Sequence, residues 1–202
     1  TAWAADFDKG LAAYNAGDFD AALAELKPLA EQGDASAQFN LGVIYDLGKG
    51  VTEDDEEAAK WFTLAAEQGN APAQYNLASI YENGDGVKED GKKAAQWYRL
   101  AAEQGNAAAQ RNLGVMYDNG KGVIEDDKEA LKWYRLAAEQ GVADAQYSLG
   151  LSFANGQGGV IQDDVYAHMW WNLAAANGHE DARFNKGIVV KRMTSQDTVS
   201  YT

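Results

Sequence analysis

The tetrapeptide Ala-Glu-Gln-Gly occurs four times in this chain, at 30–33, 66–69, 102–105 and 138–141. The spacing is always 36 residues, and the motif returns as Ala-Ala-Asn-Gly at 175–178, one residue late. The delay arises because Gly158-Gly159 stands where each earlier repeat has a single glycine. A period of this length indicates one supersecondary unit per repeat, which buries its apolar face only by stacking on its neighbours. We therefore expect residues 1–202 to form a single solenoid domain rather than two ordinary domains.

Each repeat carries two amphipathic helical patterns joined by a glycine-rich turn. The first runs from Ala35 to Leu47, where apolar residues recur every three to four positions on one stripe. Glycine in the following turn, Gly48-Lys49-Gly50-Val51, permits a positive φ, and Val51 is free to pack back onto the helices. The second helix is expected to begin at a capping acid and to end at a glycine. The capping acids are Asp54, Asp90, Asp126 and Asp163, and the closing glycines are Gly69, Gly105, Gly141 and Gly178.

The second helix has an apolar face of alanine and aromatic residues, for example Ala58, Trp61, Phe62, Ala65 and Ala66. Alanines let neighbouring helices approach closely, and the larger rings fill the remaining space. The aromatic pairs are Trp61-Phe62, Trp97-Tyr98, Trp133-Tyr134 and Trp170-Trp171. Stacking on a sugar is the alternative, but identical recurrence in every repeat favours a core role. Truncation of Trp97 to alanine is then expected to cost about 3–5 kcal/mol.

The consensus Ala-x-Ala-Gln-x-x-Leu-Gly-x-x-Tyr-x-x-Gly-x-Gly-Val, followed by Ala-x-x-Trp-Tyr/Phe-x-x-Ala-Ala-Glu-Gln-Gly, resembles the Sel-one-like repeat (SLR). That family is related to the tetratricopeptide repeat and has a longer turn. The resemblance implies an all-α, right-handed α-α superhelix of about five hairpins that binds protein segments, often as an adaptor. Full units match at 34–69, 70–105, 106–141 and 142–178. Residues 7–33 resemble a shorter tetratricopeptide-like cap, and 179–202 would form a capping helix and tail.

Composition excludes several classes of function. Acids outnumber bases by 31 to 17, and the net charge of −14 argues against nucleic-acid and anionic-lipid partners. The absence of cysteine excludes disulfides, thiolate metal sites and cysteine nucleophiles. No stretch of about 18 apolar residues is present to span a membrane. The serines have neither a nearby base nor a glycine elbow. We therefore predict a non-enzymatic protein without cofactors.

Two clusters of potential metal ligands lack the spacing that a metal site requires. His168 and His179, with Glu180 and Asp181 beside the latter, lack the helical spacing of a ligand pair, so surface or capping histidines are predicted. The acidic run 53–57 suggests calcium, but its glycines precede the acids, and the acids continue into a helix. Electrostatics at helix N-termini explains these acids better. We predict no metal site.

The resemblance to tetratricopeptide-like solenoids implies that first helices line a concave groove. The predicted groove residues are Phe39, Val43, Asp46, Tyr75, Ser79, Glu82, Arg111, Val115, Asp118, Tyr147, Leu151 and Phe184. Five of them form a ladder of large side chains, a composition typical of interface hot spots. The ladder residues are Phe39, Tyr75, Arg111, Tyr147 and Phe184. The alternative is that the ladder fills gaps between adjacent first helices. Acids at one groove position, together with the net charge, favour a partner with basic segments. Lys60 and Lys132 on the second helices should matter little, because those helices face the convex side.

These observations predict a protein-interaction module that binds a peptide or helix in its groove. A cell-wall or β-lactam-directed hydrolase is the first alternative, which the resemblance allows through a cysteine-rich bacterial branch. The absence of cysteine from this chain counts against it. A structural spacer that self-assembles through its convex surface is the second. The oligomeric state and the identity of the partner stay open.

Both ends of the chain carry signals of their own. Ala2-Trp3-Ala4 has the small-x-small form of a signal-peptidase site and predicts a periplasmic or secreted protein. The alternatives are a cytoplasmic protein and a Trp3 that anchors the first helix. The basic stretch 183–192 is read as a polar cap or, alternatively, as a partner-docking patch. Thr194-Ser195-Gln196-Asp197 resembles a helix N-cap, which leaves a longer native chain open.

Overall fold

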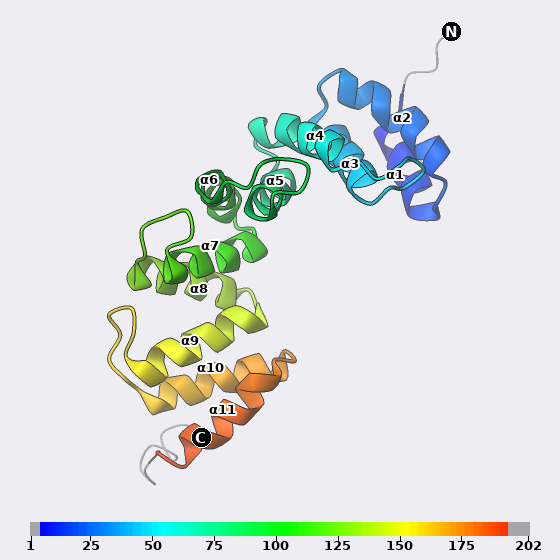
Figure 1. Ribbon diagram of the computed structural model, residues 1–202. Coiled ribbons are helices and arrows are strands. Elements are labelled where there is room, and N and C mark those ends of the chain that lie inside the picture. The colour runs from blue at the N-terminus through cyan, green and yellow to red at the C-terminus, as the bar shows by residue number, and fades with distance from the viewer. Residues whose placement is uncertain (1–4, 194–202) are drawn as a thin grey trace. The chain divides into compact units, whose positions relative to one another are not determined.

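A computed structural model describes residues 5–193 (Figure 1). The signal-peptidase-like sequence at 2–4 and the cap-like sequence at 194–197 lie outside the described residues. Over the described range the chain forms eleven helices and no strand, which confirms the all-α prediction. The chain divides into two compact units, Thr1–Gln104 and Gly105–Thr202, and each is described by itself.

The first unit contains three helical hairpins. Their helices are α1 (Phe7–Ala16) and α2 (Phe19–Glu31), α3 (Ala35–Asp46) and α4 (Asp55–Glu67), and α5 (Ala71–Asn83) and α6 (Gly91–Glu103). Each helix packs against the next one in sequence. The predicted short cap is present, since α1 ends at Gly17 with a φ of 80° and Asp18 caps α2 at once.

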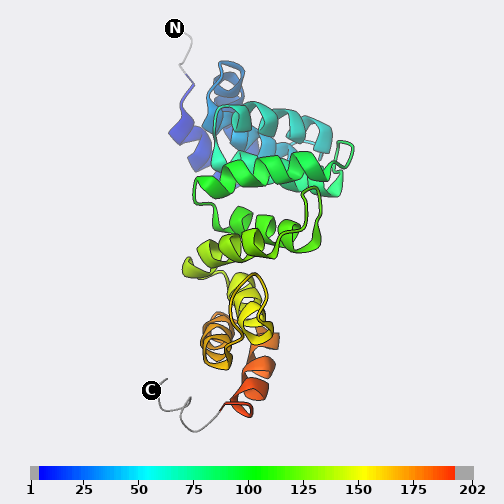
Figure 2. The ribbon, with the colours of Figure 1, turned by 90° about the vertical axis from the view of Figure 1, so that its left-hand side faces the viewer.

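The second unit contains two hairpins and one further helix. These are α7 (Ala107–Asn119) and α8 (Asp127–Glu139), α9 (Ala143–Asn155) and α10 (Asp164–Ala176), and α11 (Glu180–Val190). The helix α11 packs on α10, and the two views of the ribbon agree on this placement (Figures 1 and 2). Odd-numbered helices are called first helices below, and even-numbered helices are called second helices.

The predicted caps of the second helices are confirmed. Each acid accepts hydrogen bonds from backbone amides of the first turn, for example Asp54 from Glu57 N at 2.9 Å. Asp90, Asp126 and Asp163 each accept two such bonds. These bonds occupy amides that a helix start otherwise leaves without partners. The acidic turns therefore serve the helix termini, as predicted.

A buried glutamine links three helices at each of several junctions. Gln38 of α3 is 4% exposed, donates to Ala30 O at the end of α2, and accepts from Gln68 Nε2 beyond α4. Gln146 does the same with Ala138 O and Asn177 in the second unit. Buried amides need such partners, so this position fixes how consecutive hairpins join. The repeated Ala-Gln is visible in the sequence, but this role depends on contacts between helices that no local pattern predicts.

In three hairpins a glycine of the first helix lies very close to an aromatic ring of the second helix. A Cβ placed on Gly42 would lie 2.7 Å from Phe62, and one on Gly114 would lie 2.6 Å from Tyr134. Alanines that are at most a few per cent exposed, such as Ala58 and Ala65, surround the rings. The absence of a side chain at the glycine is thus what lets the ring reach the first helix.

The prediction that every tryptophan of the aromatic pairs lies in the core is wrong in part. The second members Phe62, Tyr98, Tyr134 and Trp171 are buried, as predicted. Of the first members, only Trp133 and no other in the described chain is buried, whereas Trp61, Trp97 and Trp170 are half-buried. The first position of the pair lies at the edge of the helix interface, so its burial depends on what the neighbouring hairpin places over it.

Candidate functional site

The twelve predicted groove residues all lie on first helices. The first unit holds Phe39, Val43 and Asp46 on α3, with Tyr75, Ser79 and Glu82 on α5. The second unit holds Arg111, Val115 and Asp118 on α7, Tyr147 and Leu151 on α9, and Phe184 on α11. Asp118 and Phe184 are exposed, and the other ten are half-buried. Within each unit, some of these residues line a cavity, whereas others pack on rings of their own hairpin or pair with a neighbouring first helix.

In the first unit, a cavity of about 110 Å³ gathers three predicted residues from two consecutive first helices. Asp46 comes from the end of α3, and Tyr75 and Ser79 come from α5. The remaining lining residues are Phe62, Asn76, Ile80 and Asp85. The apolar members lie beside hydroxyl, amide and carboxylate groups, which is the composition expected of a site for one polar side chain.

Two carboxyl groups, of Asp46 and Asp85, line this cavity without a cationic side chain beside them. No described side chain pairs with Asp46, and burial raises the pKa of its carboxyl above the ordinary value. The carboxylates of Asp55 and Asp85 raise this pKa further. Asp85 accepts a hydrogen bond from Asn83 Nδ2 at 3.1 Å, and no cationic side chain of the described residues forms an ion pair with it. A cationic group entering this cavity would offset the repulsion between the carboxylates.

The other two acids of the same repeat position already have partners. Tyr98 Oη donates to Glu82 Oε2 at 2.9 Å, and Tyr134 Oη donates to Asp118 Oδ2 at 3.5 Å. Burial raises the pKa of Tyr134, and the Asp118 carboxylate raises it further, so this hydroxyl stays protonated and donates. The acids at this position therefore differ, because in α4 the equivalent ring is Phe62, which has no hydroxyl.

The ladder residues also pack within their own hairpins. The ring centroid of Phe39 lies 6.0 Å from that of Phe62, and Tyr75 lies 5.7 Å from Tyr98. Val43 packs against the same core cluster as Phe39. Val115, Leu151 and Tyr147 likewise pack against core clusters of the second unit. The alternative that the ladder fills gaps between helices accounts for part of each side chain, and the smaller part that stays exposed is what a partner can contact.

Arg111 and Tyr147 are held by residues that sequence analysis did not connect with them. Arg111 Nη2 lies 3.1 Å from Asp144 Oδ2, and its Nη1 donates to Asn112 Oδ1 at 3.0 Å. Tyr147 stacks on His179 with centroids 4.2 Å apart. Asp144 therefore competes with any carboxylate of a ligand for the Arg111 guanidinium. Consecutive first helices bring these residues together, and no periodicity within one helix reveals it.

The two described histidines, His168 and His179, lie in different environments. His179 caps α11, since its Nδ1 accepts from Ala182 N at 3.4 Å, which confirms the capping prediction. His168 is half-buried in α10. Burial, and secondly Lys186, lower the pKa of His168. No group of three or more potential metal ligands occurs among residues 5–193.

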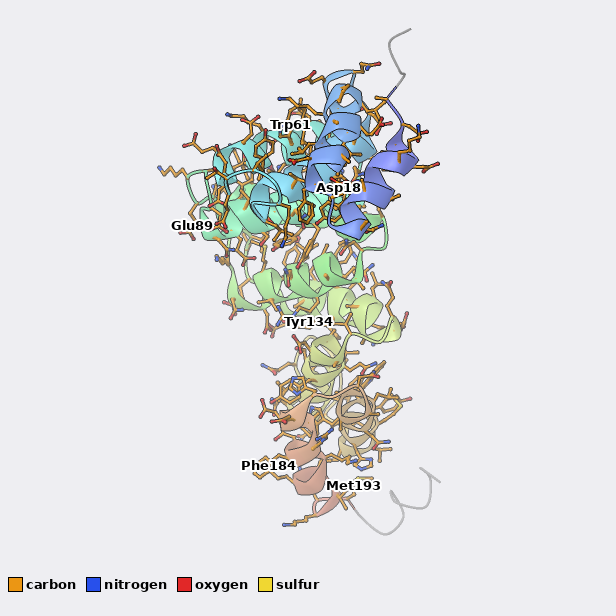
Figure 3. The ribbon with its side chains drawn as sticks, turned by 90° about the vertical axis from the view of Figure 1, so that its right-hand side faces the viewer. Asp18, Trp61, Glu89, Tyr134, Phe184 and Met193 are labelled. Atoms are coloured by element: carbon orange, nitrogen blue, oxygen red, sulfur yellow. The ribbon has the colours of Figure 1, made fainter. Side chains whose placement is uncertain are left out.

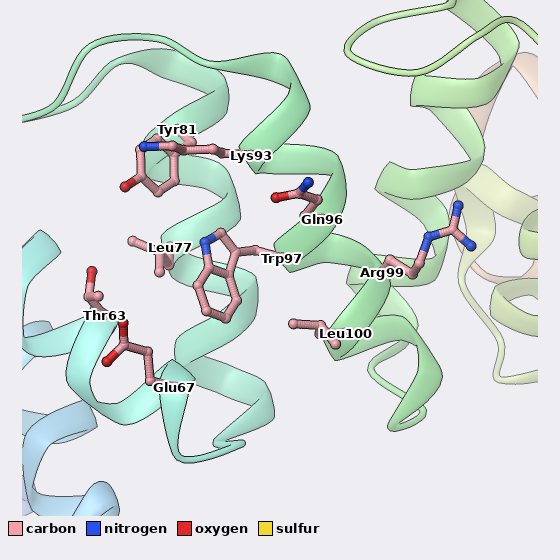
Figure 4. A pocket seen from close by; sticks show the side chains of 9 residues that line it. All are labelled: Thr63, Glu67, Leu77, Tyr81, Lys93, Gln96, Trp97, Arg99 and Leu100. Carbon is pink, nitrogen blue, oxygen red and sulfur yellow. The ribbon is translucent and has the colours of Figure 1, made fainter.

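A second cavity, of about 600 Å³, lies beside second helices (Figure 4). The Trp97 indole projects from α6 toward Leu77 of α5, with Thr63 and Glu67 of α4 across the opening (Figure 4). A similar cavity of about 580 Å³ beside Trp170 occurs in the second unit. None of the predicted groove residues lines either cavity.

Over the described range, no helix combines the length and apolar character needed to cross a membrane.

Comparison with known proteins gives four consecutive matches to the Sel1 repeat, at residues 35–70, 71–106, 107–142 and 143–179. No curated protein matches the chain. The fold is similar to a Sel1 repeat protein from Oxalobacter formigenes, with 36% identity and a TM-score of 0.85 over 90% of this chain and 74% of that one. It is also similar to a protective antigen of uropathogenic Escherichia coli that displays an SLR fold, with 45% identity and a TM-score of 0.80.

That second match covers 84% of this chain, which spans only 36% of the antigen. Cysteine rich protein B of Helicobacter pylori is more distant, with 26% identity and a TM-score of 0.51 over 63% of this chain and 92% of that one. Together with the repeated hairpins, these neighbours confirm the predicted solenoid fold class.

Proposed function

Because this chain belongs to the Sel1-repeat family, whose members generally act as protein–protein interaction modules, we propose that it is a non-enzymatic adaptor. Its partner is a peptide or helix that lies along the first helices. The contacts are made by the exposed parts of the ladder residues, with carboxylates beside them. Aromatic side chains suit this role, since they bury a large area at a small cost in conformational entropy.

The cavity between α3 and α5 is the observation that carries this proposal. Asp46, Tyr75 and Ser79 were selected on sequence grounds as groove residues, and all three line it. Its unpaired carboxylate favours a lysine or arginine side chain of the partner. The net charge of −14 adds a long-range field that speeds the encounter with basic segments at low salt.

The hydrolase alternative receives no support from the residues of this chain. Sel1-repeat proteins are generally scaffolds rather than enzymes. The cysteine-rich branch that motivated the alternative is represented here by a neighbour of 26% identity, whereas this chain contains no cysteine. Turnover of peptidoglycan or of a β-lactam by the purified protein would contradict the proposal.

Selection from a library of randomised peptides tests the proposal directly. We expect the selected sequences to be enriched in lysine or arginine next to an apolar residue. Tyr75→Ala should weaken binding of a selected peptide by about 2 kcal/mol, measured at a temperature at which the variant is fully folded, because this ring also packs on Tyr98. Lys60→Ala is the matched control, because this exposed side chain pairs with Glu57 on a second helix. Equal affinity of the Tyr75→Ala variant and the parent for the peptide would refute the hypothesis that the partner binds along the first helices.

A further inference from the structure

A cavity of the same kind occurs once in each unit, beside the first tryptophan of an aromatic pair. In the first unit the cavity has a volume of about 600 Å³, and Trp97 forms one wall (Figure 4). In the second unit it has a volume of about 580 Å³, and Trp170 lines it. Glu67 and Glu139 line the two cavities at one further position of the repeat. Both volumes lie within the range of about 300–1,000 Å³ that is typical of small-molecule sites.

Both indoles are fixed in place and remain accessible. Trp97 packs against the core cluster of α4 and α5, and Trp170 packs against that of α8 and α9. Each ring nevertheless stays partly exposed, whereas Trp133 is 4% exposed. Trp61 packs on the core cluster of α2 and α3 and lines neither cavity (Figure 3). Because a fixed ring loses little conformational entropy when a ligand stacks on it, Trp97 and Trp170 offer preformed flat walls.

A second ring lines each cavity, and a side chain of the second helix lies over it. Lys93 Nζ is 4.8 Å from the ring centroid of Tyr81 (Figure 4). At the same repeat position, Tyr166 stacks on Phe153 with ring centroids 5.1 Å apart. The indole is thus the wall that keeps the same chemistry in both cavities, while the neighbouring wall varies.

The charge of the two cavities differs in sign. The charged lining residues are Glu67, Lys93 and Arg99 in the first cavity and Arg135, Glu139 and Asp163 in the second. Bases outnumber acids in the first set, and acids outnumber bases in the second. A charged ligand common to both cavities would be attracted by one and repelled by the other. The features that both cavities share, an indole and one exposed glutamate, therefore favour an uncharged ligand that carries both C–H and O–H groups.

We propose that each cavity binds a glucose ring of a neutral oligosaccharide. The substituents of glucose lie close to the plane of its ring, which leaves flat faces of C–H groups. One such face stacks on the indole of Trp97 or Trp170, which offers a large apolar area. A hydroxyl group of the sugar donates to the carboxylate of Glu67 or Glu139. An apolar side chain of a peptide would also contact the indole but would offer this carboxylate no donor.

The two cavities are separate from the predicted groove, because its residues line neither of them. Recurrence in every repeat counted against a sugar as the partner of the tryptophans. The structure removes this objection, because the four pairs are not equivalent. Trp133 is buried, whereas Trp97 and Trp170 line cavities.

Cellotetraose and maltotetraose are the probes, because both are neutral chains of glucose and they differ in linkage. Each indole N–H gives one signal in a ¹H–¹⁵N correlation spectrum of the protein, and replacement of single tryptophans by phenylalanine assigns the signals. We expect at least one probe to shift the Trp97 and Trp170 signals saturably. The Trp133 signal should stay in place, since this ring is 4% exposed. Calorimetry should give one binding site for each of the two cavities.

Two pairs of substitutions compare the cavities with each other. Trp97→Ala should abolish binding at the first cavity and leave the Trp170 signal responsive, and Trp170→Ala should do the reverse. Glu67→Ala should weaken the affinity reported by the Trp97 signal by about fivefold or more, because a hydrogen bond to a charged group is lost. Glu139→Ala is the matched control for this signal, since it removes the same group from the other cavity. Both glutamates are exposed, so neither substitution should disturb the fold.

Three outcomes would overturn the proposal. Absence of any shift of the Trp97 and Trp170 signals with both sugars at millimolar concentration would exclude glucose chains from the cavities. Two binding sites that persist in Trp97→Ala, with unchanged affinity in Glu67→Ala, would place the sugar elsewhere on the protein. Shifts of both signals by N-acetylleucine amide, with no response to either sugar, would assign the cavities to apolar side chains of a protein partner.

Discussion

The Tyr98 hydroxyl donates a 2.9 Å hydrogen bond to Glu82 Oε2 and so joins α6 to α5. Tyr134 and Asp118 repeat this contact between α8 and α7. In the hairpin of α3 and α4 the acid is kept as Asp46, whereas the ring is Phe62. The same repeat position thus holds a satisfied carboxylate in two hairpins and an available one in a third, which is where the small cavity lies.

Tyr98→Phe should destabilise the protein by about 1–2 kcal/mol. The substitution removes one hydrogen bond to a half-buried carboxylate and leaves the packing of the ring intact. Urea unfolding of the variant and the parent measures the difference. Tyr166→Phe is the control, because this ring is half-exposed, at 50%, and contributes mainly by stacking on Phe153. Equal stability of Tyr98→Phe and the parent would show that the bond contributes nothing net.

Much of the fold could be predicted from the sequence because local signals agree with one another. The capping acids, the apolar stripes and the turn glycines each fix the same boundaries, so the helix starts at Asp55 and Asp127 follow directly from Asp54 and Asp126. The short first hairpin was likewise predictable from Gly17 and Asp18. The burial of Trp97 was not, because it depends on the width of the gap between hairpins rather than on spacing within a helix.

Only those residues of the candidate site that occupy equivalent positions in successive repeats could be predicted from the sequence. Counting along the repeat places Asp46, Tyr75 and Ser79 on one surface, and the structure brings them to one cavity. Asp85 also lines that cavity but comes from the turn after α5, which the count of first-helix positions leaves out. The Arg111–Asp144 ion pair was missed for a related reason, since it joins two neighbouring first helices.

Gly150→Ala should destabilise the second unit. The added methyl group would meet the Trp171 indole, which cannot move aside easily because its Nε1 donates to Tyr147 O at 3.1 Å. Overpacking of this kind costs about 1–3 kcal/mol, against a gain in helix propensity of at most about 1 kcal/mol. Thermal unfolding measures the net effect. Gly187→Ala, where the methyl group meets nothing, should instead raise the melting temperature.

Trp97→Ala should cost about 1–2 kcal/mol, less than the sequence-based expectation, because the indole is half-buried and forms one wall of the 600 Å³ cavity. Tyr98→Ala should cost about 3–5 kcal/mol, since that ring is 1% exposed. Denaturant unfolding of the two variants side by side checks the order. A larger loss of stability for Trp97→Ala than for Tyr98→Ala would show that Trp97 contributes as a core residue.

Asp46→Asn should stabilise the protein near neutral pH. The pKa of Asp46 is raised in the folded state from the ordinary value of 3.8, mainly by burial. Between those two pKa values the folded protein binds more protons than the unfolded chain, so stability falls as the pH rises through the raised pKa. The amide carries no charge and escapes this loss. The melting temperatures of variant and parent should therefore agree in their pH dependence below pH 3.8, diverge between pH 3.8 and the raised pKa, and differ by a constant amount above it. A constant difference from below pH 3.8 to above the raised pKa would contradict the assignment.

Replacement of both cavity carboxylates, Asp46→Asn with Asp85→Asn, should weaken binding of a lysine- or arginine-containing peptide by about tenfold or more. The loss has two sources, namely direct pairing with the cationic side chain and the long-range attraction of an acidic protein. The double variant Asp8→Asn with Asp20→Asn separates these two sources, because it also removes two negative charges, but from the exposed first turns of α1 and α2.

Titration calorimetry at low and at high salt measures the affinity of each double variant for the peptide. We expect the control pair to lower affinity slightly and only at low salt, where exposed charges are poorly screened. The cavity pair should lower it at both salt concentrations, because a desolvated ion pair is screened much less. Equal losses for the two pairs would mean that the partner senses the net charge of the protein and does not enter the cavity.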